Sequence, residues 1–395
     1  IVIEWRSAME KVVLLKCEEY NTKLIEEKLR EGFDLLGGDK FLRELIPYNS
    51  KVLLKPNMLA IEEAGSPVIT NFNVFEAVIK IIKDYSSNIS FGDSPGFGEA
   101  KKAAERSGLL KVAEKYDVKF EDFKESTHVK LDESILCKSW TVAKAPYEAD
   151  VLITLPKLKT HAMAYFTGAV KNQFGCIPGT LKATWHTRMP KANNFCKMLL
   201  DLNSLVNTSF AILDGIVAME GNGPKSGKPK KMNTMIMGKS LTAVDSTAVR
   251  LIGYDNPLDI PVLKEAYDHN WGTVLTKDIQ VLGEDIESMK SKDFELCRKG
   301  GNFYFISPGV TNFLRDLIAP DPSLIAEKCI SCKRCQEVCP EKPRVIKMIN
   351  NKGKVQPTWN MKECIRCFCC QELCPCGAIE TKYSILGKML KMNKR

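Results

Sequence analysis

The stretches CISCKRCQEVCP (329–340) and CIRCFCCQELCP (364–375) decide the fold of the C-terminal part of this chain. Each has the spacing C-x2-C-x2-C-x3-C-P. Gaps of two residues let one tight loop present three thiolates to a single metal centre. The proline after the fourth cysteine turns the chain away, because it fixes φ and has no N–H. Zinc sites usually pair two CxxC knuckles or combine one with histidines, so a third cysteine plus CP, occurring twice, fits zinc and disulfides poorly.

The region 323–383 resembles the two-cluster ferredoxins of bacteria, which hold two [4Fe–4S] clusters. In those proteins the fourth cysteine of each run ligates the cluster of the other run. The resemblance therefore implies one cluster held by Cys329, Cys332, Cys335 and Cys374. The other would be held by Cys364, Cys367, Cys370 and Cys339.

Length and composition indicate a globular protein of two or three domains. The chain has 395 residues, of which 44% are hydrophobic and 27% charged, as is usual for soluble proteins. No apolar run reaches the length of a membrane span, and no signal peptide is recognisable. Fifteen cysteines without an export signal predict a reducing, cytoplasmic and anaerobic setting. The net charge of +9, without an arginine-rich run, argues against nucleic acid as a partner.

Alternating strand and helix patterns before residue 300 predict an α/β domain with a mostly parallel sheet and flanking helices. We expect this domain at 9–305, a linker at 306–322, a small α+β ferredoxin-like domain at 323–383 and a basic tail at 384–395. Residues 1–8 precede Met9 and are left out of the fold prediction. Strands are expected at 11–16, 51–57, 89–92, 117–123, 139–144, 150–155, 209–214, 234–238 and 279–282. Helices are expected at 22–36, 73–84, 99–115, 191–204, 243–252 and 260–269.

The densest polar stretch, ITLPKLKTHAMAYFTGAVKNQFGCIPGTLKATWHTR (153–188), begins at the carboxyl end of an apolar strand. Open α/β sheets place their ligand sites there. Cations and imidazoles in a glycine-rich stretch suit an anionic ligand with carboxylate or phosphate groups. A basic surface loop is the alternative interpretation. The candidate residues are Lys157, Lys159, His161, Lys171, Asn172 and His186.

Four shorter motifs offer further polar groups after strands. GDSPG (92–96) places Asp93 and Ser94 before a helix N-terminus, where an anion could bind, although a simple turn would look the same. DGIVAMEGNGP (214–224) places Asp214 and Glu220 around a glycine-rich loop that could serve a metal, a substrate or only a turn. The remaining candidates are Lys55 and Asn57 in KPN, and Asp245 in AVDSTA as a helix cap. His128 and His269 have no motif around them and are expected at the surface.

Together these motifs resemble the DUF362 family, a group largely of unknown function and often fused to a two-cluster ferredoxin module. The matching stretches are KPN, GDSPG, LPKLKTH…TGAVKNQFG…PG…H, DGI…MEGNGP and AVDSTA. A shorter block, His161…TGAVK…IPG…His186, is similar to the H…SGGRK…LPG…H segment of nickel-dependent lactate racemases. That likeness implies Lys171 as anchor of a nickel pincer cofactor, His186 as metal ligand and His161 as acid/base. TGA replaces SGG here, and those enzymes carry no ferredoxin module.

Three functions are therefore open. The first is an iron–sulfur oxidoreductase, in which the ferredoxin module passes electrons from a redox partner protein, such as a ferredoxin or reductase, to an anionic substrate or cofactor. Lys157, Lys159 and Lys171 would hold the anion, and His161 or His186 would handle protons. The second is an electron-transfer or redox-sensing protein without chemistry of its own. The third is a metal-dependent isomerase or racemase, with an additional metal or organic cofactor in the α/β domain.

Overall fold

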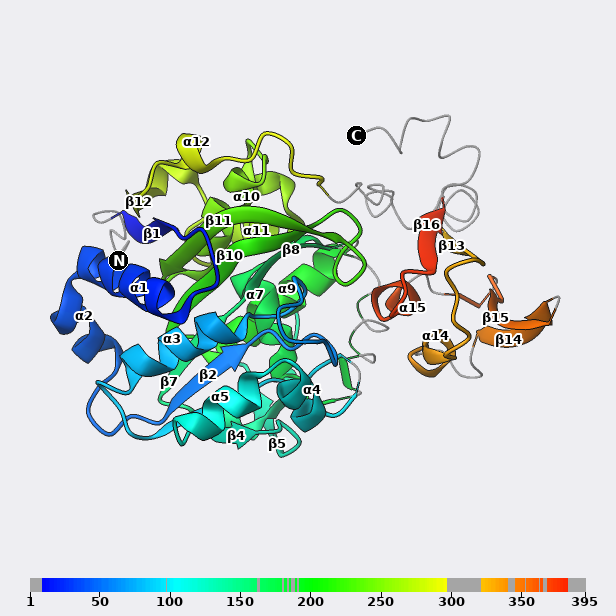
Figure 1. The fold of residues 1–395 in the computed structure, drawn as a ribbon, viewed down its shortest axis with the longest axis horizontal. Coiled ribbons are helices and arrows are strands. Elements are labelled where there is room, and N and C mark those ends of the chain that lie inside the picture. Colours follow the sequence, from blue (N-terminus) through cyan, green and yellow to red (C-terminus); the bar gives the residue numbers. More distant parts are fainter. Residues whose placement is uncertain are drawn as a thin grey trace.

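The computed structural model describes residues 9–96, 98–161, 164–179, 181–182, 185, 189, 192–296, 321–339, 345–351, 353–361, 363–364 and 368–382. A ten-stranded sheet forms the centre of the N-terminal domain, and the elements of the ferredoxin domain gather beside it (Figure 1). Within the described residues, no helix combines the length and apolar character needed to cross a bilayer.

The main path of the sheet runs in the order β12-β1-β11-β10-β7-β2-β3-β4. Strands from β10 through β7, β2 and β3 to β4 are mutually parallel, as are β1 and β12, whereas β11 is antiparallel to both of its neighbours. The predicted α/β class with a mostly parallel sheet is confirmed. The bounds are β1 (Glu10–Lys16), β2 (Val52–Pro56), β3 (Ile89–Gly92), β4 (Lys119–Glu121), β7 (Val151–Leu155), β10 (Phe210–Glu220), β11 (Lys228–Gly238) and β12 (Ile279–Gly283).

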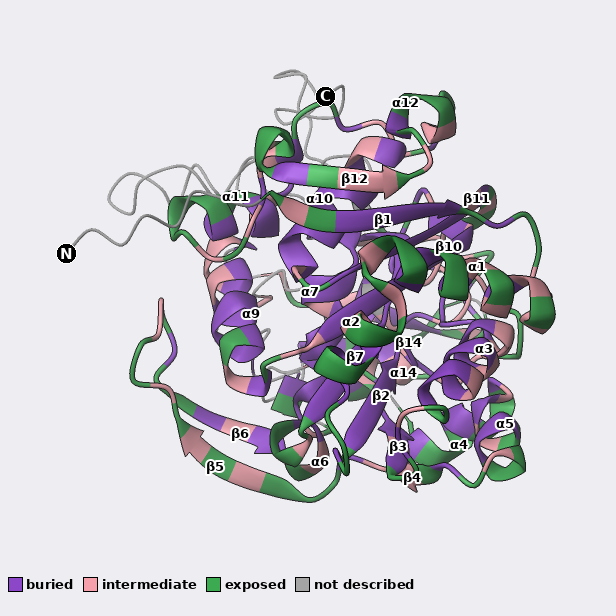
Figure 2. Ribbon diagram, turned by 90° about the vertical axis from the view of Figure 1, so that its left-hand side faces the viewer, coloured by how far each residue is buried: buried purple, intermediate pink, exposed green. Residues whose placement is uncertain are grey.

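Both faces of the sheet are covered by helices, so the strands read as continuous apolar runs. Successive side chains of a strand point to opposite faces. Val13 and Leu15 accordingly join one core, and Val12 and Leu14 the other. The first core includes α1 (Thr22–Leu36), α2 (Gly38–Leu45), α3 (Phe72–Ile82), α4 (Ala100–Arg106) and α5 (Leu109–Lys115). The second includes α7 (Ala169–Asn172), α9 (Ala192–Val206), α10 (Leu241–Leu251), α11 (Pro261–Asp268) and α12 (Ile286–Met289). Figure 2 shows the buried strands between the outward, exposed faces of the helices.

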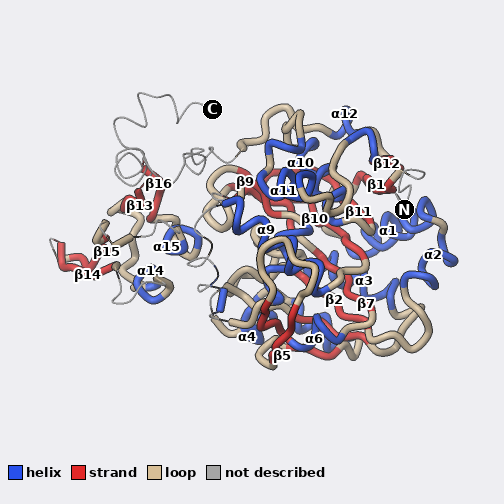
Figure 3. Tube along the Cα trace, turned by 180° about the vertical axis from the view of Figure 1, so that it is seen from behind, coloured by secondary structure: helices blue, strands red, loops and turns tan. Residues whose placement is uncertain are grey.

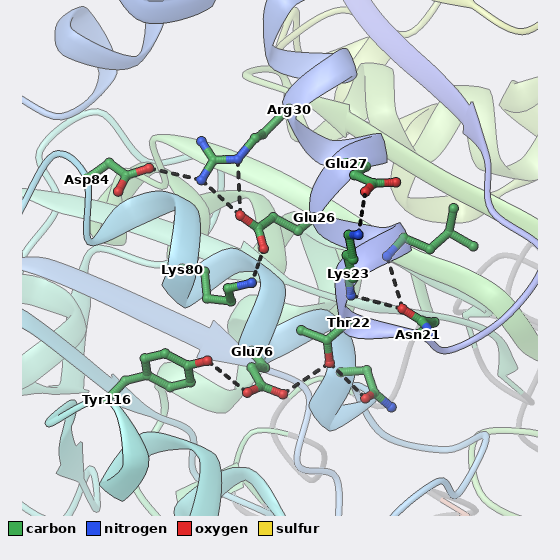
Figure 4. A network of polar contacts seen from close by, with 12 residues as sticks. Asn21, Thr22, Lys23, Glu26, Glu27, Arg30, Glu76, Lys80, Asp84 and Tyr116 are labelled. Carbon is green, nitrogen blue, oxygen red and sulfur yellow. Dashed lines mark hydrogen bonds and ion pairs between the residues drawn. The ribbon is translucent and has the colours of Figure 1, made fainter.

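Polar contacts tie the first helices together at the surface (Figure 4). Asn21 caps α1 by accepting hydrogen bonds from the amides of Lys23 and Leu24 at 3.0 and 3.1 Å. Glu26 of α1 pairs with Lys80 of α3, which fixes the two helices side by side. The cap explains why the predicted start of this helix at residue 22 agrees with the structure.

Three sequence expectations differ from the structure. The helix expected at 99–115 is two helices, α4 and α5, because Gly108 between them has a left-handed φ of 79°. The strand expected at 139–144, β6 (Ser139–Ala143), lies outside the main sheet and pairs with β5 (Ser126–Lys130) in a separate hairpin that projects from the domain (Figure 2). The stretch after β7, for which no strand was expected, contains two more strands, β8 (Lys157–His161) and β9 (Tyr165–Thr167).

Some short elements were also not predicted from the sequence. They include α6 (Lys144–Glu148) and the 3₁₀ turns η1 (Gln173–Cys176), η2 (Pro257–Asp259) and η3 (Thr276–Asp278).

In its described residues, the ferredoxin-like domain contains two antiparallel strand pairs and two one-turn helices, which lie together in Figure 3. β13 (Asp321–Leu324) pairs with β16 (Ile379–Lys382), and β14 (Ile346–Asn351) with β15 (Lys354–Trp359). β13 begins two residues before the expected domain start at 323, and most of the expected linker lies outside the described residues. The helices α14 (Arg334–Glu337) and α15 (Cys369–Glu372) start 35 positions apart, the offset of the two cysteine runs.

The residues before these helices share a backbone conformation. Lys333 and Phe368, which follow the second cysteine of each run, both have a left-handed φ, of 59° and 56°. The two runs therefore take the same local path, as a duplicated cluster loop would.

Candidate functional site

Strand β8 carries Lys157, Lys159 and His161 at alternate positions, so their side chains share one face. All five residues of this strand are buried. A buried lysine requires hydrogen-bond acceptors and, when charged, a counter-charge. The partners of each lysine therefore show what it does.

Lys157 belongs to a closed structural cluster. Its Nζ donates to Asp214 Oδ2 at 2.7 Å and to Tyr20 Oη at 2.6 Å, and Tyr20 Oη donates to Asp214 Oδ1 at 2.8 Å. The amide of Asn71 supplies a third contact to Asp214, at 3.1 Å. Lys157 and Asp214, both expected to bind a ligand, instead join β8 and β10 to the segment after β1.

A second network joins three of the sequence motifs. Lys55 Nζ donates to Asp93 Oδ1 at 2.8 Å and to the carbonyl of Asn172 at 2.7 Å. Asp93 Oδ2 accepts from the amide of Met58 at 2.8 Å. Asn57 Nδ2 donates to Asn172 Oδ1 at 2.9 Å, and Asn57 Oδ1 accepts from Lys159 Nζ at 3.0 Å. KPN, GDSPG and TGAVKN thus form one buried polar layer at the carboxyl ends of β2, β3 and β7.

Two buried ammonium groups in this layer have only neutral oxygen partners. Lys159 donates to Asn57 Oδ1 and to the carbonyl of Val68 at 2.7 Å, and Lys182 donates to Ser94 Oγ at 2.5 Å and to the carbonyl of Pro95 at 3.4 Å. In the part of the chain that the structure describes, no carboxylate lies within ion-pair distance of either. Burial, followed by the charge of Lys171, holds the pKa of Lys159 well below its usual value. Burial also lowers the pKa of Lys182 to about 7.

A cavity of about 260 Å³ adjoins these two lysines. From the α/β domain its lining includes Asn57, Asp93, Ser94, Lys159, His161, Lys171, Asn172 and Lys182. From the ferredoxin domain it includes Glu337, Val338, Cys339 and Leu373. Seven of the residues singled out by sequence therefore meet at one cavity, whereas Lys157, Asp214 and Glu220 do not line it; the seven are Asn57, Asp93, Ser94, Lys159, His161, Lys171 and Asn172.

Direct contacts hold the two domains together beside this cavity. Gln371 Nε2, on α15, donates to Asn222 Oδ1 at 3.1 Å, in the turn between β10 and β11. Leu373 lies against Gly96, where an added Cβ would come within 3.3 Å of Leu373 Cδ2. Two motifs found by sequence, GDSPG and MEGNGP, thus face the second cysteine run.

His161 is completely buried and has a defined neutral tautomer. Its Nδ1 accepts a hydrogen bond from the amide of Ala164 at 3.1 Å, so the proton of the neutral ring is on Nε2. A ring held in this way presents an N–H at Nε2 that can donate a hydrogen bond. His186, its expected companion, lies outside the described residues.

Asp245 holds the segment that carries Lys171. Its two carboxylate oxygens accept from the amides of Ala169 and Val170 at 2.6 and 3.0 Å. The sequence predicts a helix cap, but Asp245 caps α7, while Ser240 caps its own helix, α10. A Cβ at Gly168 would lie 2.1 Å from Asp245 Oδ1, which explains the glycine before this turn. TGAVKN and AVDSTA are therefore one structural unit.

The metal loop considered for Asp214 and Glu220 is not formed. Glu220 accepts from the amide of Glu295 at 2.8 Å, and Asp214 is bound in the cluster with Lys157. Among the described residues, no three histidine, cysteine, aspartate or glutamate side chains converge tightly enough to hold a single metal ion. His128 and His269 are exposed, as expected.

Four of the described cysteines of the two runs lie in one small core. Cys329, Cys335, Cys370 and Cys374 pack there with Ile346 and Ile379. Burial raises the pKa of Cys335 to about 11, and the thiols of Cys332, Cys374 and Cys329 raise it further. Those three neighbours and Cys335 are one of the sets implied by the ferredoxin resemblance. The set fits a cubane, in which each thiolate binds a different iron and the sulfurs lie further apart than around one ion.

An amide directed at one of these sulfurs adds to the fit. The N–H of Ala378 points to Cys374 Sγ at an N···S distance of 3.2 Å, and such bonds tune cluster potentials. For the second set, Cys339, Cys364 and Cys370 are described, but Cys367 lies outside the described residues.

Sequence reasoning missed two contributors. Lys182 lies inside the polar stretch, three residues after Gly179, but no motif distinguishes it from surface lysines. Tyr20 follows the first strand, 137 positions before Lys157, and only the fold brings them together.

The fold and site define an α/β protein joined to a ferredoxin-type iron–sulfur domain. Residues 52–250 match the family model described as "Domain of unknown function (DUF362)", and residues 321–375 match a 4Fe-4S dicluster domain. The chain belongs to the DUF362 family, as its motifs predicted.

One curated relative and two solved structures illustrate this placement. The thylakoid-associated protein sll1697 of Synechocystis sp. is 34% identical over 256 residues, which cover 65% of this chain and 78% of that protein. The lactate racemase apoprotein from Thermoanaerobacterium thermosaccharolyticum matches with a TM-score of 0.39 and 14% identity, over 59% of this chain and 54% of that one. A Thermotoga maritima protein matches with a TM-score of 0.33 and 13% identity, over 52% of each chain. This chain thus spans about half the length of both solved structures, and likeness of that extent assigns no activity.

Proposed function

We propose that this protein is an oxidoreductase in which two [4Fe–4S] clusters pass single electrons to an anionic ligand in the cavity between the domains. The observation that carries the proposal is that residues of both domains line one cavity. Cys339, a ligand in the second cluster set, lines the same cavity as Lys159, His161 and Lys182. A reducible molecule in this space would lie between an electron source and a hydrogen-bond donor.

The charge of the cavity favours an anion. Its described lining includes three lysines, Lys159, Lys171 and Lys182, against two carboxylates, Asp93 and Glu337. Asp93 is already neutralised by Lys55. A buried cation is costly without a counter-charge, so binding a carboxylate or phosphate here would relieve the desolvation of Lys159 and Lys182.

The residues would divide the work between binding the anion and stabilising the charge of the reduced ligand. Lys159 and Lys182 would hold the anionic group, and Ser94, which accepts from Lys182 and from the amide of Gly179 at 2.9 Å, has its own hydroxyl proton left to donate in a hydrogen bond. His161 would donate a hydrogen bond from Nε2 as negative charge develops on the reduced ligand. The clusters, when bound, supply electrons one at a time at low potential.

The test begins with anaerobic reconstitution, which should give about eight irons per chain if two cubanes form. Sulfate, used as a non-reducible anion, should bind the reconstituted protein and perturb the electron paramagnetic resonance spectrum of the reduced cluster near Cys339. Lys159→Met should weaken sulfate binding by at least about tenfold, the effect of 1.4 kcal/mol. Lys347→Met changes an exposed lysine of the ferredoxin domain and serves as the control.

Two outcomes would reject the proposal. Clusters that cannot be reduced would remove the electron relay. Sulfate binding that is equal in Lys159→Met and Lys347→Met would leave a ferredoxin-type carrier whose α/β domain has no anion site.

A further inference from the structure

The loop 327–333 of the ferredoxin domain lies at the surface, away from the cavity lining. Ile330 is 63% exposed, and Cys332 is the cysteine classed as exposed among those described. Lys328 and Lys333 are also exposed on either side of Ile330, together with Glu327. An apolar tip bordered by lysines thus surrounds a cluster thiol that reaches solvent.

The loop is held in this shape by the chain itself. Ser331 and Lys333 have left-handed φ values of 57° and 59°, and Ser331 Oγ donates to the carbonyl of Val355 on β15 at 2.6 Å. The outward position of Ile330 and Cys332 therefore belongs to the folded loop.

Cys332 and Cys339 mark opposite ends of the proposed relay. Cys332 is in the set with Cys329, Cys335 and Cys374, whereas Cys339 belongs to the other set and lines the cavity. One cluster therefore comes close to solvent through its ligand, and the other comes close to the anion site.

We propose that an acidic one-electron carrier protein docks on the loop 327–333 and passes electrons through the clusters to the cavity. This inference rests on the proposed function. In each transfer the carrier is oxidised by one electron and the cluster beside Cys332 is reduced by one. The electron then moves to the cluster ligated by Cys339 and on to the ligand in the cavity, with no bond made or broken in the relay.

Charge and apolar surface together identify the carrier as acidic. Within this loop the two exposed lysines, Lys328 and Lys333, outnumber the single carboxylate of Glu327. Complementary charge raises the rate of encounter and orients the partner. Ile330 offers the small apolar contact typical of transient redox complexes, which bury little surface.

The experiment compares two charge-reversed proteins, both reconstituted with clusters and checked for equal iron content. One carries Lys328→Glu and Lys333→Glu together. The control carries Lys382→Glu. Lys382 lies opposite Asp321 in the β13–β16 strand register, at the end of this strand pair that is farther from the loop 327–333. Stopped-flow absorbance follows cluster reduction by an acidic plant-type [2Fe–2S] ferredoxin that is kept reduced. At low salt we expect the double variant to be slower than the wild type by at least about tenfold and the control by less than about threefold, with the gap closing as salt screens the charges.

A second reductant separates docking from a change in cluster potential. The methyl viologen radical is a cation, so the double variant should accept electrons from it at least as fast as the wild type does. Equal slowing by both reductants would indicate an altered potential and overturn the inference. Equal rates for the double variant and the control with ferredoxin would overturn it as well. Failure of the proposed function is distinguishable, because the wild type would then hold no reducible clusters or bind no sulfate.

Discussion

Lys55 Nζ lies 2.8 Å from Asp93 Oδ1, and neither side chain has appreciable contact with solvent. The pair joins the end of β2 to the turn after β3, and Asp93 also accepts from the amide of Met58 at 2.8 Å. It is packed against η1, where a Cβ on Gly175 would lie 1.9 Å from Asp93 Oδ1. One ion pair therefore fixes the three segments that form the floor of the cavity.

Removing the charge of Asp93 should destabilise the protein strongly. Asp93→Asn leaves the Lys55 ammonium buried without a counter-ion, so we expect a loss of about 3–5 kcal/mol in the free energy of unfolding. Urea denaturation of the metal-free protein measures it. Asp39→Asn breaks an exposed pair with Arg43, at 2.7 Å, and should cost less than about 1 kcal/mol. Similar losses in both variants would contradict the role given to the buried pair.

Asp245 should act on the cavity without lining it. Asp245→Ala leaves the buried amides of Ala169 and Val170 without their acceptor, which should cost about 2–4 kcal/mol of stability. Because α7 carries Lys171 and Asn172, sulfate affinity should fall too. Asp285→Ala removes the cap of α12, a bond of 2.8 Å to the amide of Ser288, and should cost about 1 kcal/mol. An unchanged sulfate affinity in Asp245→Ala would show that the cap does not position the anion site.

Anion binding should depend on pH through Lys182. Burial lowers the pKa of this lysine to about 7, so its charged form is lost as pH rises through neutrality. Sulfate keeps its charge over this range and needs the ammonium form. Its affinity should therefore be highest below pH 7 and fall by up to about tenfold per pH unit above it. Isothermal titration calorimetry between pH 6 and 9 measures the slope.

Variants at position 182 measure how much of the pH dependence comes from Lys182 itself. They are needed because the charges of Asp93, Lys55 and Cys176 also affect the pKa of this lysine. Lys182→Met should bind more weakly at pH 6 and have a shallower pH slope, to which Lys159, whose pKa is also lowered by burial, still contributes. Lys182→Arg keeps the charge and should show the same shallower slope at higher affinity. A slope in Lys182→Met as steep as in the wild type would assign the dependence to another group.

The crosswise ligand pattern predicts unequal roles for Cys339 and Cys376. Cys339→Ser should remove a ligand of the second cluster and lower the iron content from about eight to about four per chain. Cys376 lies 3.7 Å from the sulfur of Cys374 but belongs to neither set, so Cys376→Ser should keep the full iron content. Iron and sulfide analysis after anaerobic reconstitution gives the answer. A full complement of iron in Cys339→Ser would exclude Cys339 as a ligand.

The sequence alone determined the parts of this protein that depend on local spacing. The cysteine runs, the apolar strands and the helix at 22–36 are each encoded within a few residues, and the structure has this helix where it was expected, with Asn21 as its cap. Seven candidate residues of the cavity could also be named, because parallel strands bring their carboxyl ends to one edge.

Only the tertiary structure decided which polar residues serve the cavity and which serve the fold. Lys157 and Lys159 are two residues apart on one strand, yet Lys157 is neutralised by Asp214, whereas Lys159 meets only neutral oxygens beside the cavity. Their partners lie 57 and 102 positions away in the chain, so no local pattern distinguishes the two lysines. The position of Cys339 in the cavity wall likewise follows from how the two domains pack, since burial and charge are set by neighbours distant in sequence.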